Sequence, residues 1–255
     1  MTNLEEWPWP AGTLMARLSP GSRRDLLGLG TYFYKEPGTV LMRQGDPVAK
    51  DENDKPGDSV YLLRSRDTTV SACVKITAAT GELLAIRVSG DVIGELAVLD
   101  RHSARPSTAT VCTKTIAHCI PGPVFRAFLA RHEDGWPTLC WTLADRLAWS
   151  DQRRLDFRMC QVHIRLARLL VQFVESHGRP ITLVRGSGEP VIEASEITVQ
   201  LSYEDLGNLI GARVHAVGRA MQMMRDKDLV CLHNRHIVIL DRAGLEDFGE
   251  LSDPE

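Results

Sequence analysis

Two arginines six positions apart, Arg213 and Arg219, have the chemistry for binding a nucleic acid. Arg219 could donate two hydrogen bonds to the O6 and N7 atoms of a guanine and so read a base. Arg213 could instead pair with a phosphate, which positions a protein on DNA without reading its sequence. Val214, His215 and Gly218 share the outer side of the same helical pattern, where side chains would enter a major groove. These residues therefore predict recognition of double-stranded DNA.

Two short helical patterns would hold these side chains in place. Ser202 is a good N-cap for the first, and the carboxylate of Asp205 can reach back to the backbone N–H of the cap. Gly211 follows this pattern and tolerates the positive φ of a tight turn. The second pattern has apolar residues at i, i+4 and i+7 that predict an inward face, namely Val217, Met221 and Met224. Together they predict a helix-turn-helix; the alternative is two ordinary core helices that bind no DNA.

Two β-type runs follow and flank His233-Asn234-Arg235, as in a hairpin. The segment His233–His236 could act as a wing that touches the DNA backbone. Upstream, two extended runs at residues 181–184 and 191–200 surround a glycine-rich turn, and the helix before them is expected to end at a glycine cap, Gly178.

The composition is that of an ordinary globular protein. Net charge is −3 over 255 residues, so a DNA-binding face must come from the placement of charge and not from its total. No apolar run is long enough for a membrane span, and the N-terminus carries acids where a signal peptide needs positive charge. We therefore expect a cytoplasmic protein with no membrane contact. The six cysteines form no C-x-x-C pair and are expected to be buried small hydrophobes, with no zinc site.

The segment from Phe33 to Ile120 has short β-type runs separated by glycine and proline, which predicts a barrel or roll. A short helical segment precedes it at residues 12–30. Residues 46–58 are polar and rich in turn formers, and are expected to form a long exposed loop.

The segment from residue 123 to 177 is helical throughout, with interruptions near Gly135 and Pro137. Leu139, Leu143 and Leu147 recur at i, i+4 and i+8 and so share one face of a helix. Such a stripe either packs on its own domain or pairs with the same helix of a second chain, and periodicity alone does not choose between them.

Two motifs in this order resemble the Crp/Fnr family of bacterial transcription regulators. They are "SGDVIGELAVL" (Ser89–Leu99) and "EDLGNLIGARVHAVGRAMQMMRDKDLV" (Glu204–Val230), and the resemblance covers residues 33–248. It implies an α+β fold with an N-terminal double-stranded β-helix or jelly-roll of cyclic-nucleotide-binding type, a long dimerisation helix and a C-terminal winged helix-turn-helix. The implied domains are a helical segment at 1–31, the β-roll at 32–122, helices at 123–159 and the DNA-binding domain at 160–248.

The resemblance also implies partners and roles. Leu139, Leu143 and Leu147 become a homodimer interface, and the partners are operator DNA and RNA polymerase. Arg219 matches an arginine that many members share. Val214 and His215 differ from the Arg-Glu pair of the cyclic-AMP-responsive branch, so a different operator is expected.

The resemblance further implies an effector such as cyclic AMP or another cyclic nucleotide. Gly94, Glu95 and Leu96 would bind the ribose, and Arg105 has the spacing of the phosphate arginine. However, Pro106 and an extra residue separate Arg105 from the strand "ATV"; anchored on that strand, the arginine and hydroxyl positions fall on Ser107 and Thr108. Ser150 and Asp151 would meet the base, where responsive members carry a Thr-Ser pair. Either the loop bulges and Arg105 still reaches the phosphate, or the phosphate arginine is lost and Glu95 is a structural remnant.

Two other classes compete with a regulator. A cupin-like enzyme would need clustered metal ligands, and the β segment offers only His102 and His118, while no G-x-S-x-G, H-E-x-x-H or P-loop occurs. We therefore expect no enzyme. A ligand-binding adaptor could use the winged helix to contact protein instead of DNA. The iron–sulfur chemistry of one branch of the family is not expected, because no cysteine precedes Cys73.

Overall fold

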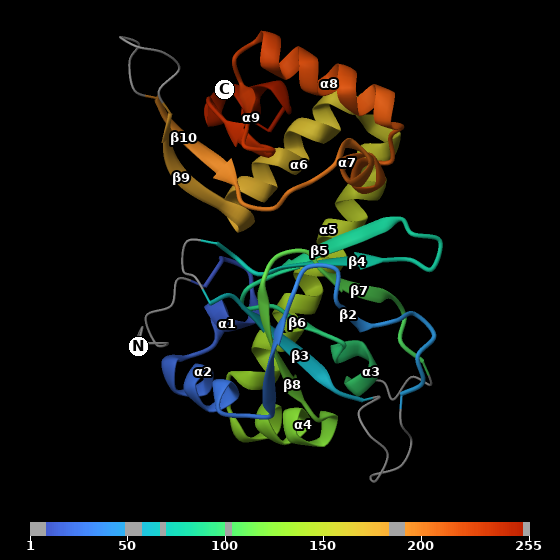
Figure 1. Cartoon of the computed structure of the whole chain (residues 1–255), viewed down its shortest axis with the longest axis vertical. Coiled ribbons are helices and arrows are strands. Elements are labelled where there is room, and N and C mark those ends of the chain that lie inside the picture. The colour runs from blue at the N-terminus through green and yellow to red at the C-terminus, as the bar shows by residue number, and fades with distance from the viewer. Residues whose placement is uncertain (1–8, 49–57, 67–69, 100–103, 184–191, 252–255) are drawn as a thin grey trace. The chain divides into compact units, whose positions relative to one another are not determined.

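The computed structural model describes residues 9–48, 58–66, 70–99, 104–183 and 192–251, with Ala97 and His177 as backbone only. The chain divides into two compact units, Met1–Leu147 and Ala148–Glu255. Most of the polar loop expected at residues 46–58, the turn at 185–190 and His102 lie outside the described residues. Figure 1 shows the elements of each unit.

The first unit begins with the two short helices that the sequence predicts at residues 12–30. Helix α1 (Leu14–Arg17) has Thr13 as its N-cap, and α2 (Pro20–Leu27) has Ser19, whose side chain accepts a hydrogen bond from the backbone of Ser22. Pro20 suits the first position of α2 because a helix leaves that N–H unpaired.

The β segment forms two four-stranded sheets in which every pairing is antiparallel, in the orders β1-β8-β3-β6 and β2-β7-β4-β5. Two antiparallel sheets of this kind confirm the expected roll. Its elements are β1 (Thr31–Lys35), β2 (Val40–Met42), β3 (Val60–Arg64), β4 (Cys73–Thr77), β5 (Leu83–Val88), β6 (Val92–Ile93), α3 (Glu95–Leu99), β7 (Thr108–Val111) and β8 (Thr115–Ile120).

Helices α4 (Gly122–Arg131) and α5 (Gly135–Met159) follow, with Pro137 in the first turn of α5. Leu62, Ile120, Phe125 and Leu139 belong to one buried cluster that joins the roll to these helices. Leu139 is thus fully buried within the first unit, so the structure corrects the prediction that this residue lies in a dimer interface.

The second unit contains α6 (Val162–His177), β9 (Gly178–Leu183), β10 (Ile192–Ile197), α7 (Tyr203–Ile210), α8 (Val214–Asp226), β11 (Val230–His233), β12 (His236–Ile239) and α9 (Arg242–Phe248). Its sheet has the order β11-β12-β10-β9 and is antiparallel. Asn234 and Arg235 both have positive φ, at 50° and 68°, and form the two-residue turn of the expected β11–β12 hairpin.

Gly178 ends α6, but not in the left-handed conformation that a glycine cap usually takes. Its φ is −78°, and a Cβ there would overlap the carbonyl oxygen of Val174. Close approach to the preceding turn therefore explains this glycine.

Among the described residues, none of the helices combines the length and the apolar character that a bilayer crossing requires.

Candidate nucleic-acid interface and effector pocket

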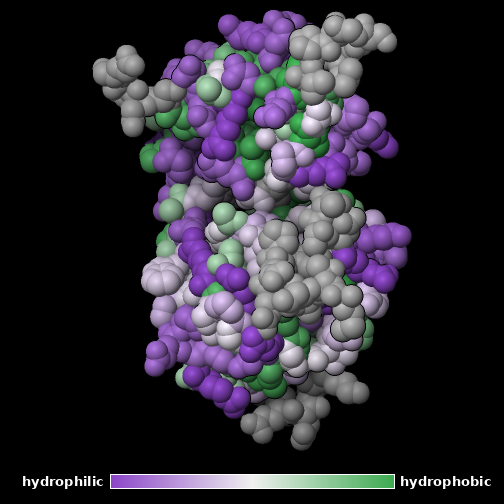
Figure 2. Space-filling view, turned by 90° about the vertical axis from the view of Figure 1, so that its left-hand side faces the viewer, coloured by the Kyte–Doolittle hydropathy of each residue, from purple (hydrophilic) through white to green (hydrophobic). Residues whose placement is uncertain are grey.

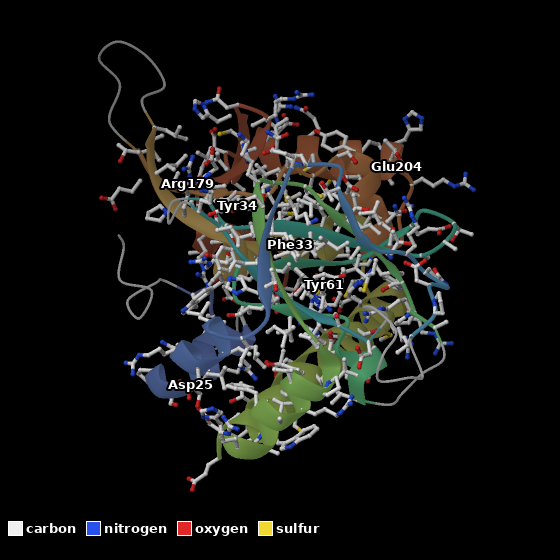
Figure 3. The ribbon with its side chains drawn as sticks, turned by 60° about the horizontal axis from the view of Figure 1, so that its bottom comes forward. Asp25, Phe33, Tyr34, Tyr61, Arg179 and Glu204 are labelled. Carbon is white, nitrogen blue, oxygen red and sulfur yellow. The ribbon has the colours of Figure 1, made fainter. Side chains whose placement is uncertain are left out.

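Helix α7 begins with the capping box that the sequence predicts. The Ser202 hydroxyl accepts a hydrogen bond from the backbone N–H of Asp205 (3.0 Å), and the Asp205 carboxylate accepts one from the backbone N–H of Ser202 (2.8 Å). Glu204, exposed in the same turn (Figure 3), adds a second negative charge near the positive end of the helix dipole. Gly211 ends the helix with φ +62°, as the turn requires.

Helix α8 has two chemically different faces. Val217, Met221 and Met224 are all 0% exposed and fix the inner face, which confirms the predicted stripe. On the outer side, Val214 is 45% exposed, and His215 and Arg219 are exposed as well. The first two turns of α8 therefore present an apolar, an imidazole and a guanidinium side chain to solvent.

Two further residues of the predicted interface flank this surface. Arg213 is exposed at the N-cap position of α8, and its side chain makes no capping hydrogen bond. Gly218 is half-buried, and a Cβ added there would meet only the Tyr203 ring, at 3.8 Å. Packing in the free protein therefore does not require a glycine at position 218.

The tip of the β11–β12 hairpin is exposed as well, with Asn234 Nδ2 3.0 Å from His233 Nε2.

The pocket in the first unit lies beside Glu95, at the start of α3. Its lining comprises Met42, Ile76, Arg87, Ile93, Gly94, Glu95, Leu96, Pro106, Ser107 and Arg146. The predicted residues Gly94, Glu95, Leu96 and Ser107 are therefore brought together. Arg105 and Thr108 are not part of the lining, and Ser150 and Asp151 lie on the part of α5 that belongs to the second unit.

Glu95 is 6% exposed and is held by Arg146 of α5. Arg146 Nη1 donates to the Glu95 carboxylate at 2.7 Å, and Nη2 donates to Asp91 Oδ1 at 3.1 Å and to the Val92 carbonyl at 3.0 Å. Burial opposes the charge of Arg146, but the carboxylates of Glu95 and Asp91 outweigh it, and the pKa of Arg146 is raised. The carboxylate expected to bind a ligand hydroxyl thus has a cationic partner within the protein.

Arg105 also reaches the pocket region, but its guanidinium binds backbone. It is 4% exposed, and its Nη1 and Nη2 donate to the carbonyls of Gly94 (3.0 Å) and Ser59 (2.7 Å). Burial lowers its pKa. Gly94 has φ +83°, and a Cβ there would lie 2.6 Å from Arg105 Nη1, so the glycine and the arginine fit as a pair. Arg105 therefore clamps the loop between β6 and α3 to the roll.

The exposed apolar residues of α5 do not follow the predicted leucine stripe. Leu143 is half-buried against the core of the first unit, whereas Leu147 is 63% exposed. Trp141, Leu155 and Met159 are exposed by 59%, 57% and 82%. On the face of the molecule shown in Figure 2, hydrophobic residues are scattered among hydrophilic ones.

The structure also locates one histidine of the β segment and the six cysteines. His118 is buried on β8, and within the described ranges no group of three or more His, Cys, Asp or Glu could hold a metal ion. None of the six cysteines, all of which are described, forms a disulfide. Cys73 is buried, Cys140 is exposed and the other four are intermediate, so the expectation of burial is wrong for Cys140.

Several known proteins are similar to this chain in sequence. A Crp-like helix-turn-helix domain matches residues 164–248. A CRP-like cAMP-activated global transcriptional regulator of Mycobacterium tuberculosis is 27% identical over 195 residues, 75% of this chain and 80% of that protein. The cAMP-activated global transcriptional regulator CRP of Salmonella typhimurium is 21% identical over 82% of this chain and 89% of that protein. These matches support a Crp/Fnr family regulator.

Solved structures agree with the family fold. FixK2 from Bradyrhizobium japonicum matches 89% of this chain and 100% of its own, with a TM-score of 0.63 and 16% identity. TTHA1359, a CRP/FNR family transcriptional regulator of Thermus thermophilus, matches 86% of this chain and 98% of its own, with a TM-score of 0.61 and 16% identity. With its Crp-like helix-turn-helix and its CRP-like relatives, the chain is a DNA-binding transcription regulator.

Sequence reasoning missed two arginines of the pocket beside Glu95. Arg146 lies 51 positions from Glu95, and no local pattern links them. Arg87 interrupts the apolar run "LLAIRV" of β5, and a charge in such a run is a usable signal. Burial, and next the charge of Arg146, lower the pKa of Arg87 to about 10.

A glycine of the helix-turn-helix was also missed. A Cβ on Gly207, inside α7, would overlap the carbonyl oxygen of Ala212, whose N–H donates to the Gly207 carbonyl at 2.9 Å. The close turn between the helices therefore depends on Gly207 as well as on Gly211.

Proposed function

We propose that the chain regulates transcription in the cytoplasm as a homodimer, with each α8 in one half of a near-palindromic operator. The observation that carries this proposal is the division of α8, whose inner face is fully buried while Val214, His215 and Arg219 remain exposed. A dimer of this kind binds half-sites about 34 Å apart, one turn of the duplex. RNA polymerase is the further partner that the family suggests.

Each exposed residue has a specific role in this proposal. Arg219 donates to a guanine, and Arg213, at the start of the helix, pairs with a phosphate. Val214 is apolar and suits the methyl group of a thymine. Gly218 leaves room for the duplex to approach, and the wing at His233–His236 contacts the DNA backbone.

The dimer uses the exposed side of α5. Trp141, Ala148 and Leu155 are spaced by seven residues, and Met159 lies one turn further, so these exposed apolar residues form a seam along one side of α5 at the heptad spacing of paired helices. Leu147 and the exposed edge of Leu143 border this seam. The proposed dimerisation helix therefore keeps part of the predicted stripe without Leu139.

The β-roll at residues 32–122 is the proposed sensory domain. A small anionic effector, such as cyclic AMP, would enter beside Glu95 and Ser107, where Arg87 supplies a positive charge that the Glu95–Arg146 pair does not consume. Effector binding would favour the orientation in which both copies of α8 fit the operator.

A second candidate is a regulator that needs no effector, with a degenerate pocket. Two observations favour it, since Glu95 is paired with Arg146 and both Nη atoms of Arg105 are bound to backbone carbonyls. Calorimetric titration with cyclic AMP and cyclic GMP separates the candidates: heat that Glu95→Ala abolishes supports the effector, and no heat from either nucleotide supports the second candidate.

DNA binding is tested by selecting operators from random duplexes and measuring their affinity by fluorescence anisotropy. Arg219→Ala should cost about 1–3 kcal/mol and relax the preference at one base pair. Arg213→Ala should weaken all sequences alike and flatten the salt dependence, because a phosphate contact releases counterions. Failure to select any duplex would instead support the adaptor, in which α8 contacts protein.

A further inference from the structure

A second cavity lies wholly within residues 148–255, among the end of α5, α6 and α7. Its apolar wall consists of Trp149, Phe157, Leu169, Leu209, Ile210 and Leu251. Gln152, Arg153, Asp156, Arg165, Arg168 and Gln172 complete the lining. An apolar wall with a few convergent polar groups is the usual form of a small-molecule site.

Positive charge exceeds negative charge in this lining, with three arginines against one carboxylate. Arg168 already holds that carboxylate, because its Nη1 donates to Asp156 Oδ1 at 2.8 Å. The Gly249 carbonyl accepts a hydrogen bond from Arg168 Nε at 2.7 Å, which fixes this side chain further. The arginines therefore outnumber the carboxylates of the lining by two, and the other two arginines are Arg153 and Arg165.

These two guanidinium groups lie against the aromatic residues of α5. Arg153 lies over the Trp149 ring at 4.3 Å from its centroid, and Arg165 lies over the Phe157 ring at 5.5 Å. The Nε atom of Arg165 is buried and has no hydrogen-bond partner among the residues that the structure describes. Burial alone lowers the pKa of Arg153 to about 10. Desolvated cations on aromatic rings are suited to receiving an anion, because the anion replaces the lost hydration.

We propose that this cavity binds a small organic anion, a carboxylate or phosphate attached to an apolar ring. Arg165 and Arg153 would receive the anionic group, and the ring would pack on Leu169, Leu209 and Ile210. The site is separate from the pocket beside Glu95, which lies in the first unit. At 3.6 residues per turn, Arg153 and Phe157 of the cavity also lie on a different side of α5 from the Trp141–Leu155 seam.

The position of the site gives the ligand a regulatory role, which rests on the proposed reading of DNA by α8. Leu209 and Ile210 are the last residues of α7, and Arg153 Nη2 donates to the Asn208 carbonyl at 3.4 Å. The Phe157 ring would touch a Cβ on Gly211 at 3.2 Å. A ligand that moves Phe157 or Arg153 therefore acts on the turn that sets the direction of α8.

Calorimetry on the full chain without DNA tests the site, with phenyl phosphate, benzoate, inorganic phosphate and benzyl alcohol as probes. We expect phenyl phosphate or benzoate to bind, and the two show which anion is preferred. Inorganic phosphate and benzyl alcohol, which lack the ring or the charge, should bind at least about tenfold more weakly. Absence of binding by both aromatic anions would overturn the proposal.

Variants locate the binding. Arg165→Gln should weaken the preferred probe by about tenfold or more, as expected for loss of a charged hydrogen-bond donor. Arg154→Gln removes the same charge from an exposed position outside the lining and should leave binding unchanged. Thermal unfolding checks that each variant is folded, and Arg153→Gln provides a second test if Arg165→Gln is not. Equal affinity of the Arg165 and Arg154 variants would overturn the assignment.

Hydrogen exchange gives an independent location. The preferred probe should slow exchange of the backbone amides of residues 206–211 and leave the loop at 92–96 unchanged. Protection confined to residues 92–96 would place the anion in the pocket beside Glu95 and refute the second site. Because none of these measurements uses DNA, failure of the proposed DNA reading would leave their outcome interpretable.

Discussion

Replacing Arg105 with methionine separates a structural clamp from an effector ligand. The methionine keeps much of the apolar stem but removes the guanidinium that donates to Ser59 and Gly94 at 2.7 and 3.0 Å. Two buried carbonyls then lose their partners, at about 1–3 kcal/mol each. Burial lowers the pKa of Arg105, so losing the charge also relieves a desolvation penalty, which offsets part of this cost.

We therefore expect Arg105→Met to destabilise the ligand-free protein by about 2–3 kcal/mol, roughly 5–10 °C in Tm for a unit of this size. Urea unfolding followed by circular dichroism measures the change, and faster hydrogen exchange at residues 59–64 and 92–96 localises it. The matched control is Arg126→Met, because Arg126 donates one hydrogen bond, to the Val98 carbonyl at 3.1 Å, and should cost about 1 kcal/mol.

The opposite result would refute this reasoning. If Arg105 were a phosphate ligand and not a clamp, the ligand-free protein would change by less than about 0.5 kcal/mol. Binding of cyclic AMP would then be lost in a protein of normal stability. That pair of results would show that the loop carrying Pro106 delivers Arg105 to the effector.

Three further predictions follow from other parts of the structure. Gly207→Ala should lower the Tm of the second unit by several degrees, because the added Cβ would overlap the Ala212 carbonyl. Gly218→Ala should leave the Tm unchanged or slightly higher and should weaken DNA binding instead. His118 is 2% exposed, and burial, followed by a neighbouring arginine, lowers its pKa to about 4. The imidazole of His118 is therefore protonated at a higher pH in the unfolded chain than in the folded one, and the free energy of unfolding should fall by about 3 kcal/mol as pH drops from 6.5 to 4. Urea titrations at each pH measure this dependence, and His118→Leu should remove most of it. Leu155→Lys should shift the protein to a monomer in analytical ultracentrifugation, and a variant that stays dimeric would exclude the proposed seam.

Local patterns in the sequence were enough to predict the helix-turn-helix. The capping box at Ser202, the turn at Gly211 and the spacing of Val217 and Met221 depend on residues within one or two turns of each other. Such features follow from backbone geometry and side-chain periodicity, which the order of residues shows directly. The predicted roll and hairpin were confirmed for the same reason, because their turns have local signals.

The chemistry of the pocket was decided only by the tertiary structure. Arg105 has the spacing of a phosphate ligand, yet the carbonyls that it binds include one 46 positions away. Arg146 reaches Glu95 across 51 positions, and Leu139 is buried because the roll covers that part of α5. A long, flexible side chain can serve a ligand, a carboxylate or a backbone carbonyl, and only the groups that folding brings within about 3 Å determine which one it serves.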